Sequence, residues 1–268
     1  MKRAWLLGFA LCLGLSGIPT VGAAEAAKSQ PASIHPAQID PARIDAIARA
    51  TIARYQLPGL ALGVIEDGQV VFARGYGETV AGSGEAVDPA TVFKIASNSK
   101  AMTAAVLARL AQQDQLRWDD PVVQHLPGFA MHDPWVTRHM TVADLLVHNS
   151  GLPEGGGDLM LWPEPNLFSR DDIVHGLRYI VPAYGFRAGY AYDNLLYVVA
   201  GELAAKVAGV PYETLVRREI FEPLGLDRCV VGEFNREALG NVAQPHWYDG
   251  KQVLPMRQDP ATTYSRLS

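Results

Sequence analysis

The sequence predicts an α/β (α+β) fold, with an α/β part built from the start of the chain and a largely helical part inserted into it. Three observations indicate this architecture: a helix pattern followed directly by a hairpin pattern, a long helical stretch in the middle of the chain, and short strand patterns near its end. A two-stranded hairpin is marginal by itself, so the sheet needs the returning strands.

Residues 39–91 begin the α/β part, and two kinds of signal define their elements. Asp40 and Pro41 suit the N-cap and first position of a helix whose apolar residues recur at helical spacing. Apolar runs on either side of Asp67 and Gly68 indicate a hairpin. The expected elements are a helix from Asp40 to just before Pro58, strands over residues 60–65 and 70–73, and a glycine-marked loop over 75–84.

Residues 92–226 are expected to form the helical part. Residues 101–110 are apolar almost all round, which predicts a buried central helix. Ser169 suits the N-cap of a second helix, and Gly209 suits the end of a third. The further helices expected are 140–147, one beginning at Ser169, 194–207, and a last helix over 211–220. Residues 227–268 then supply return strands, incomplete in this chain, with a hairpin at Asp249-Gly250.

The composition excludes several classes of protein. The 268 residues are 49% hydrophobic and 19% charged, as in an ordinary globular protein. The net charge is -5 and no basic block occurs, which argues against nucleic-acid binding. Two cysteines in a chain of this length exclude a disulfide-stapled scaffold.

Residues 1–23 have the layout of a cleavable export signal. Two basic residues open it, an uncharged apolar run follows to Leu15, and small residues end it. Cleavage after Ala23 or Ala24 predicts a bacterial periplasmic or secreted protein with no stable membrane insertion. An uncleaved anchor is the alternative, because residues 4–24 carry no charge.

Two consequences follow from that cleavage. It removes Cys12 and leaves Cys229 alone, so no intramolecular disulfide is possible. The new N-terminus then starts with a flexible lead-in over residues 24–38, which is rich in Ala, Pro, Ser and Gln.

Ser97 and Lys100 form a candidate catalytic pair just before the buried helix. On a helix they are three residues apart and share a face. A serine hydroxyl is a poor nucleophile unless a base lies within hydrogen-bond reach, and a desolvated lysine can serve. Ser99 is one step off that face and is the weaker candidate. The alternative is a capping serine beside a surface lysine.

Tyr192 and Asn194 form a second candidate group at the start of another apolar helix. A tyrosine near a lysine can share the handling of protons. An amide side chain can bind a substrate carbonyl and hold the lysine in place. A plain helix N-terminus, capped by Asp193 or Asn194, is the alternative.

These segments resemble a known family. Residues 93–104, Phe-Lys-Ile-Ala-Ser-Asn-Ser-Lys-Ala-Met-Thr-Ala, look like the active-site segment of the serine β-lactamase and penicillin-binding protein superfamily. Tyr192-Asp193-Asn194 resembles the Tyr-x-Asn element of its class C branch. Three further stretches, residues 115–121, 145–153 and 220–226, agree, and the similarity runs from about residue 39 to the end.

The resemblance implies a β-lactamase/transpeptidase-like fold, with an antiparallel sheet flanked by helices, and a mechanism without metal or cofactor. Ser97 would attack a carbonyl and form an acyl-enzyme, with its backbone N–H as half of the oxyanion hole. Lys100 and Tyr192 would move the protons, and which of them is the base stays open. Asn194 would contact the substrate amide. The substrate is a small molecule or peptide: a β-lactam, a D-Ala peptide or a small ester.

Two departures from the family pattern affect these expectations. Arg187-Ala188-Gly189 stands where many relatives have a Pro-Pro-Gly turn. No Lys-Thr-Gly or His-x-Gly follows Tyr192, although this third motif supplies the other oxyanion donor. The expectation is therefore a chain truncated at its C-terminus. The alternative function is a catalytically impaired relative that binds cell-wall peptide or a partner.

Four other groups of residues have ordinary structural interpretations. His148 is expected to be structural, and Cys229 to be a buried thiol. His132, Asp133 and His139 fit no common zinc spacing, so no metal site is expected. Trp162 and Tyr184 could line a cleft or simply pack.

Overall fold

The structure is a computed structural model that describes residues 40–162, 167–232 and 234–256. The predicted export signal over residues 1–23 and the lead-in over 24–38 lie outside the described residues. The part of the predicted return strands beyond residue 256 lies outside them as well.

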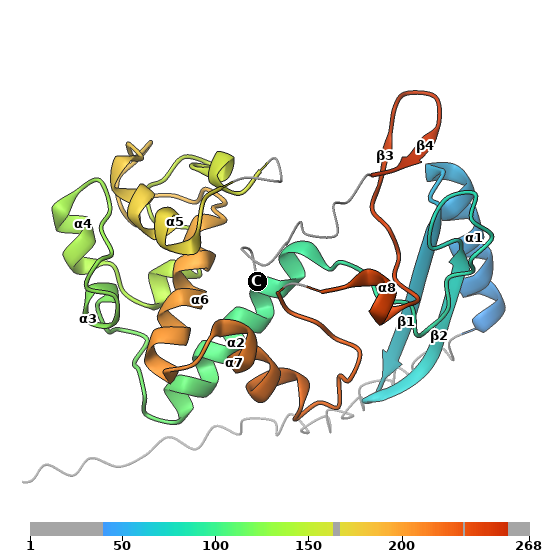
Figure 1. Cartoon of the computed structure of the whole chain (residues 1–268), viewed down its shortest axis with the longest axis horizontal. Helices are drawn as coiled ribbons and strands as arrows, with labels where there is room; N and C mark the ends of the chain where they lie inside the picture. The colour runs from blue at the N-terminus through green and yellow to red at the C-terminus, as the bar shows by residue number, and fades with distance from the viewer. Residues whose placement is uncertain (1–39, 163–166, 233, 257–268) are drawn as a thin grey trace, which may run out of the picture. The chain divides into compact units, whose positions relative to one another are not determined.

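A helix and a hairpin begin the fold, as predicted. The helix packs on the hairpin, whose strands pair antiparallel around Asp67 and Gly68 (Figure 1). Ala48, Phe72 and Tyr76 are the buried centre of the small core between them. The elements are α1 (Pro41–Tyr55), β1 (Gly59–Glu66) and β2 (Gln69–Gly77).

The second strand is longer than the sequence predicts. Gly75 and Gly77 lie on β2 rather than in the predicted loop. At Gly75 a Cβ atom would lie 2.1 Å from the Val87 carbonyl oxygen. The chain after β2 approaches the strand so closely that only a residue without a side chain fits.

The helical part is built around two apolar helices, α2 and α6, which pack against each other (Figure 1). Val106, Leu107 and Leu110 of α2 are fully buried in the larger core, with Val199 and Leu203 of α6. The elements are η1 (Ala96–Asn98), α2 (Ser99–Gln112), α3 (Val122–His125), α4 (Pro134–His139), η2 (Ala143–Leu145), η3 (Asp158–Met160), α5 (Arg170–Gly176), η4 (Leu177–Tyr179), α6 (Leu195–Ala208), α7 (Tyr212–Val216) and η5 (Arg217–Phe221).

The predicted start of α5 and the predicted end of α6 are confirmed. Ser169 accepts from the Asp172 N–H, and the Asp172 side chain accepts from the Ser169 N–H, which completes a capping box before α5. Gly209 ends α6 in the left-handed region, with φ 67°.

The predicted helix over residues 140–147 is wrong, because only the 3-10 turn η2 forms there. The Thr141 backbone N–H and hydroxyl both donate to Asp144 Oδ2, at 2.8 and 2.7 Å. These two bonds to the Asp144 carboxylate, one from the backbone and one from a side chain, close a tight turn instead of a longer helix.

The predicted last helix over residues 211–220 is also corrected. It begins as α7 and continues as the π-helical turn η5, and it is not the last. α8 (Arg236–Leu239) follows, and its N-terminus is capped by Asn235, whose Oδ1 accepts from the Ala238 N–H at 3.0 Å.

The return strands form a hairpin, but not the predicted extension of the first sheet. β3 (His246–Tyr248) and β4 (Val253–Pro255) pair only with each other within the described residues. Several contacts join this region to the earlier chain: Val92 forms a bridge with Val242, and the Gln244 N–H donates to the Thr79 carbonyl at 2.9 Å. His246 Nε2 accepts from the Ala81 N–H at 3.0 Å.

No single helix in the described part of the chain is long and apolar enough to cross a membrane. Two consecutive segments, α6 and the run from α7 to η5, are long and apolar enough only when they are counted together. They are bent by 79° relative to each other.

Candidate active site

Ser97 lies in the turn η1, directly before α2 rather than on it, and its side chain is exposed. The residue before it, Ala96, has φ 46°, in the left-handed region that alanine rarely adopts. Such a conformation costs about 1–3 kcal/mol and persists where the surrounding structure requires it. The turn thereby presents a serine hydroxyl at the N-terminus of the buried helix α2.

Lys100 lies behind Ser97 on the first turn of α2. Its Nζ donates to Ser97 Oγ at 3.0 Å, which is the contact that the three-residue spacing predicts. The lysine is 8% exposed, so its ammonium is largely removed from water. It is therefore held by a few protein groups and not by solvent.

Tyr192 comes from the segment just before α6 and meets the same serine. Its hydroxyl donates to Ser97 Oγ at 2.7 Å. A hydroxyl oxygen has two lone pairs, so Oγ can accept from Tyr192 and Lys100 together. Both groups that could take the serine proton are therefore within hydrogen-bond distance of it.

Asn194 holds Lys100 from the other side. Its Oδ1 accepts from Lys100 Nζ at 2.7 Å, and the residue is only 6% exposed. Its Nδ2 donates to both carboxylate oxygens of Asp158, at 3.2 and 3.1 Å. The structure thus brings together all four residues that the sequence singles out, Ser97, Lys100, Tyr192 and Asn194, and it adds Asp158.

Sequence reasoning missed Asp158. The available signal was the run Gly155-Gly156-Gly157 before it, because such a run marks a turn of unusual backbone. At Gly157, with φ 85°, a Cβ atom would lie 2.3 Å from Leu195 Cδ1. The glycine lets this turn approach the start of α6 and places Asp158 beside Asn194.

Aromatic rings surround the Lys100 ammonium. Nζ lies 4.8 Å from the Tyr192 ring centroid and 5.3 Å from that of Tyr197. Both distances allow cation–π attraction, which is stronger where water is excluded. Tyr197 is fixed by its hydroxyl, which donates to the Leu146 carbonyl at 2.9 Å. Tyr197 is a second residue that sequence reasoning missed.

His148 has the contacts of a structural residue. Its ring stacks on that of Tyr192 at 4.5 Å, and its Nδ1 accepts from the Asp193 N–H at 3.1 Å. Burial lowers the pKa of His148, and the positive charge of Lys100 lowers it further. The neutral His148 ring therefore packs against the Tyr192 ring and helps to fix its position.

Asp193 lies between the two functional residues and is completely buried. Its Oδ1 accepts from the Leu196 N–H at 2.9 Å and so caps α6. Its Oδ2 has no hydrogen-bond partner among the described residues. Burial raises the pKa of Asp193 to about 7, and the nearby charge of Asp158 adds to that effect.

Arg187 ties the segment before Tyr192 to η2. Its Nε and second guanidinium nitrogen donate to the two oxygens of Asp144, at 2.9 and 2.6 Å. Its backbone N–H donates to the Asn149 carbonyl at 2.8 Å. Arg187, which stands where the resembled family has the first proline of a Pro-Pro-Gly turn, therefore holds two loops together. We call this contact between Arg187 and Asp144 the clamp.

The other singled-out residues lie away from the Ser97 hydroxyl. Trp162 packs partly buried against the large core, and Tyr184 donates to the His148 carbonyl at 3.4 Å. Asp133 caps α4, and His139 stacks on Trp135. In the described part of the chain, no group of three or more His, Cys, Asp or Glu side chains is placed to hold a metal ion.

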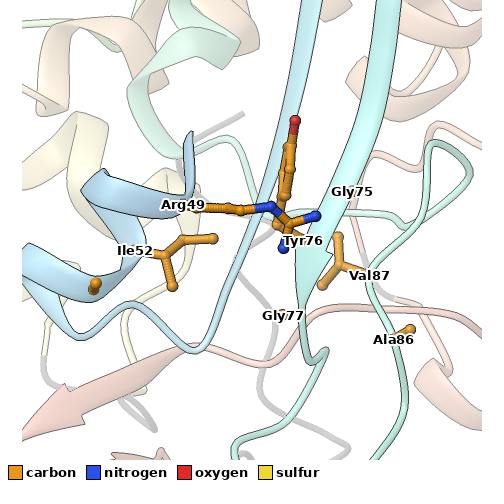
Figure 2. A pocket seen from close by; sticks show the side chains of 8 residues that line it. Arg49, Ile52, Gly75, Tyr76, Gly77, Ala86 and Val87 are labelled. Carbon is orange, nitrogen blue, oxygen red and sulfur yellow. The ribbon is translucent and has the colours of Figure 1, made fainter. Parts of the chain in front are cut away.

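A separate hollow of about 450 Å³ lies between α1 and the end of β2 (Figure 2). Arg49 extends from α1 toward β2, with its guanidinium carbon 5.8 Å from the Tyr76 ring centroid. Neither a serine nor a lysine lines this hollow. It therefore lacks the chemistry found at Ser97.

Known proteins are similar to most of this chain. A family model described as Beta-lactamase matches residues 44–265. The Unguisins hydrolase ungD' of Aspergillus campestris is 31% identical over 228 residues, which are 80% of this chain and 42% of that protein. The D-alanyl-D-alanine-carboxypeptidase/endopeptidase AmpH of Escherichia coli is 32% identical over 174 residues, which are 63% of this chain and 44% of that protein.

A solved structure agrees with the sequence similarity. The octameric penicillin-binding protein homologue from Pyrococcus abyssi superposes with a TM-score of 0.69 at 26% identity, covering 81% of this chain and 50% of that one. The chain spans half of that structure's length and less than half of the length of the two curated relatives.

Proposed function

This chain belongs to the β-lactamase family, and we propose that it is a serine hydrolase that forms an acyl-enzyme at Ser97 on an amide or ester carbonyl. The observation that carries the proposal is the convergence of Lys100 Nζ and the Tyr192 hydroxyl on Ser97 Oγ, at 3.0 and 2.7 Å. A helix-capping serine requires neither contact.

The first half of the reaction transfers the acyl group of the substrate to Ser97 Oγ. As Ser97 Oγ bonds to the carbonyl carbon, the Lys100–Tyr192 pair takes the hydroxyl proton. The carbonyl π electrons move to oxygen, and the Ser97 backbone N–H stabilises that negative charge. Collapse of the tetrahedral adduct breaks the bond to the amine or alcohol, which leaves with the proton held by the pair.

The second half reverses the roles. A water molecule gives its proton to the Lys100–Tyr192 pair as its oxygen bonds to the acyl carbon. Collapse of this second adduct breaks the bond to Ser97 Oγ, and the proton returns to the serine. The acid product leaves, and the balance is the addition of one water across the scissile bond.

The substrate class rests on the relatives. One is named a hydrolase of unguisins and the other a D-alanyl-D-alanine carboxypeptidase/endopeptidase. We propose a small molecule or peptide with an accessible amide or ester: a β-lactam, a D-Ala peptide or a short ester. Residues 1–23 add the proposal of export to a bacterial periplasm or medium, because their charge and apolar pattern is that of a signal peptide.

Labelling with a fluorescent fluorophosphonate tests the proposal. We expect the native chain to be labelled, Ser97→Ala to lose labelling, and Ser99→Ala to keep it. Ser99 is the matched control because it lies two residues from Ser97 at the same turn. Equal labelling of native protein and Ser97→Ala, or none of the native protein, would reject the hydrolase and favour a binding role.

Substrate competition then ranks the classes. Benzylpenicillin, a D-Ala-D-Ala peptide and a p-nitrophenyl ester are each added before the probe. The compound that blocks labelling of the native chain at the lowest concentration identifies the class of carbonyl that Ser97 accepts.

A further inference from the structure

Asp158 is a half-buried acid at the site that the reaction above does not use. It lies at the start of η3 and contacts only the Asn194 amide nitrogen among the site's side chains. Burial raises its pKa, while the Asn194 hydrogen bonds and the charge of Lys100 act in the opposite direction. A carboxylate in that position acts on Asn194 and, through it, on Lys100.

The asparagine amide has two different ends. Its oxygen only accepts hydrogen bonds and its nitrogen only donates them. Lys100 only donates, and an ionised Asp158 only accepts. A flipped Asn194 would face its NH2 to the ammonium and its oxygen to the carboxylate, and both contacts would be repulsive. Asp158 therefore selects the orientation in which the Asn194 oxygen faces Lys100.

We propose that Asp158 is a positioning residue, which locks the Asn194 amide so that Lys100 is held on Ser97 Oγ. This inference rests on the proposed function for its effect on rate. Its prediction for the position of Lys100 can be tested whether or not the chain catalyses a reaction.

The Asp158 side chain is not needed to hold the turn that carries it. The turn that carries it is fixed by backbone bonds: the Gly155 N–H donates to the Tyr192 carbonyl, and the Asp158 N–H donates to the Gly155 carbonyl, both at 3.0 Å. Substitution of the Asp158 side chain leaves these bonds in place. The turn is thus expected to keep its path while Asn194 loses its fixed orientation.

The first experiment is a crystal structure of Asp158→Asn, beside the control Glu154→Gln. Glu154 is an exposed acid four residues earlier, and its substitution also removes one charge. We expect Lys100 Nζ to leave hydrogen-bond distance of Ser97 Oγ in Asp158→Asn and to keep it in the control. Retention of the native 3.0 Å contact in Asp158→Asn would overturn the proposal, whether or not the chain turns over.

The second experiment measures probe acylation at saturating fluorophosphonate for Asp158→Asn and Asp158→Glu. We expect the rate constant to fall at least about tenfold in Asp158→Asn, with little change in the half-saturating concentration, and to recover to within about threefold in Asp158→Glu. A space-filling role reverses this order, because asparagine has the native size and glutamate does not. Asparagine equal to or better than glutamate would overturn the proposal.

The two failures are distinguishable. If the native chain is not labelled, the proposed hydrolase is rejected, and the crystal structure of Asp158→Asn still decides whether Asp158 positions Lys100.

Discussion

The clamp between Arg187 and Asp144 is open to a quantitative test. The Asp144 side chain is 7% exposed, while that of Arg187 is 48% exposed. Hydrogen bonds to charged partners contribute about 1.5–3 kcal/mol, and exposure of the guanidinium reduces that value. Asp144 also accepts from Thr141, so it is not left bare. We therefore expect Arg187→Ala to lower the free energy of unfolding by about 2 kcal/mol.

The chain supplies a matched control. Arg117 and Asp119 form the same two-bond pair, at 3.0 and 3.1 Å, but both side chains are more than two-thirds exposed. We expect no resolvable change for Arg117→Ala, because exposed pairs are screened by water and salt. A drop of about 2 kcal/mol corresponds to about 4–8 °C in Tm for a domain of this size.

Urea unfolding at pH 7 of the native chain, Arg187→Ala, Asp144→Asn and the double variant isolates the pair. Burial alone would raise the pKa of Asp144, but Arg187 and Thr141 more than offset it, so the pKa lies below its ordinary value. The stabilisation is therefore present above about pH 4 and is lost as the pH falls further. Equal losses for Arg187→Ala and Arg117→Ala, or additive effects in the cycle, would refute the reasoning.

Three further outcomes are expected. Lys100→Met should reduce probe acylation by about 10²–10⁴-fold, while Lys251→Met leaves the labelling rate unchanged. Leu110→Ala should cost about 2–5 kcal/mol in urea unfolding because the side chain is fully buried, whereas Leu167→Ala, at a fully exposed position, should cost nothing measurable. Because the pKa of Asp193 is raised to about 7, the folded chain retains a proton that the unfolded chain loses above about pH 4. Stability should thus decline between pH 4 and 7 by at most about 4 kcal/mol, and Asp193→Asn should remove that decline; an unchanged slope in urea unfolding would contradict the assignment.

The local elements were predictable where a single short-range rule governs them. The hairpin at Asp67-Gly68 and the capping box at Ser169 depend on residues within four positions of one another. The spacing of Ser97 and Lys100 likewise predicts their contact directly, because residues three positions apart along a helical turn lie on the same face.

What depends on distant contacts was not predictable. Residues 140–147 have helix-compatible composition, yet a local bond from Thr141 to Asp144 and a distant ion pair from Arg187 fix a turn. Asp158 reaches Asn194 across 36 positions through a turn that only glycines permit. Hydrophobic periodicity and secondary-structure propensity contain no information about either of these long-range contacts.

Buried apolar side chains form two separate clusters, one under the α1–β1–β2 unit and a much larger one among the helices. The side chains that meet at Ser97 come from the helical part of the chain, from α2 and from the segment at the start of α6. In energetic terms the site lies inside a single cooperative unit, since opening of the small hairpin core would break none of its hydrogen bonds. Amide protons of α1 and β2 should therefore exchange with solvent well before those of α2 and α6. The catalytic geometry can then persist through fluctuations that open the α1–β1–β2 unit over residues 41–77.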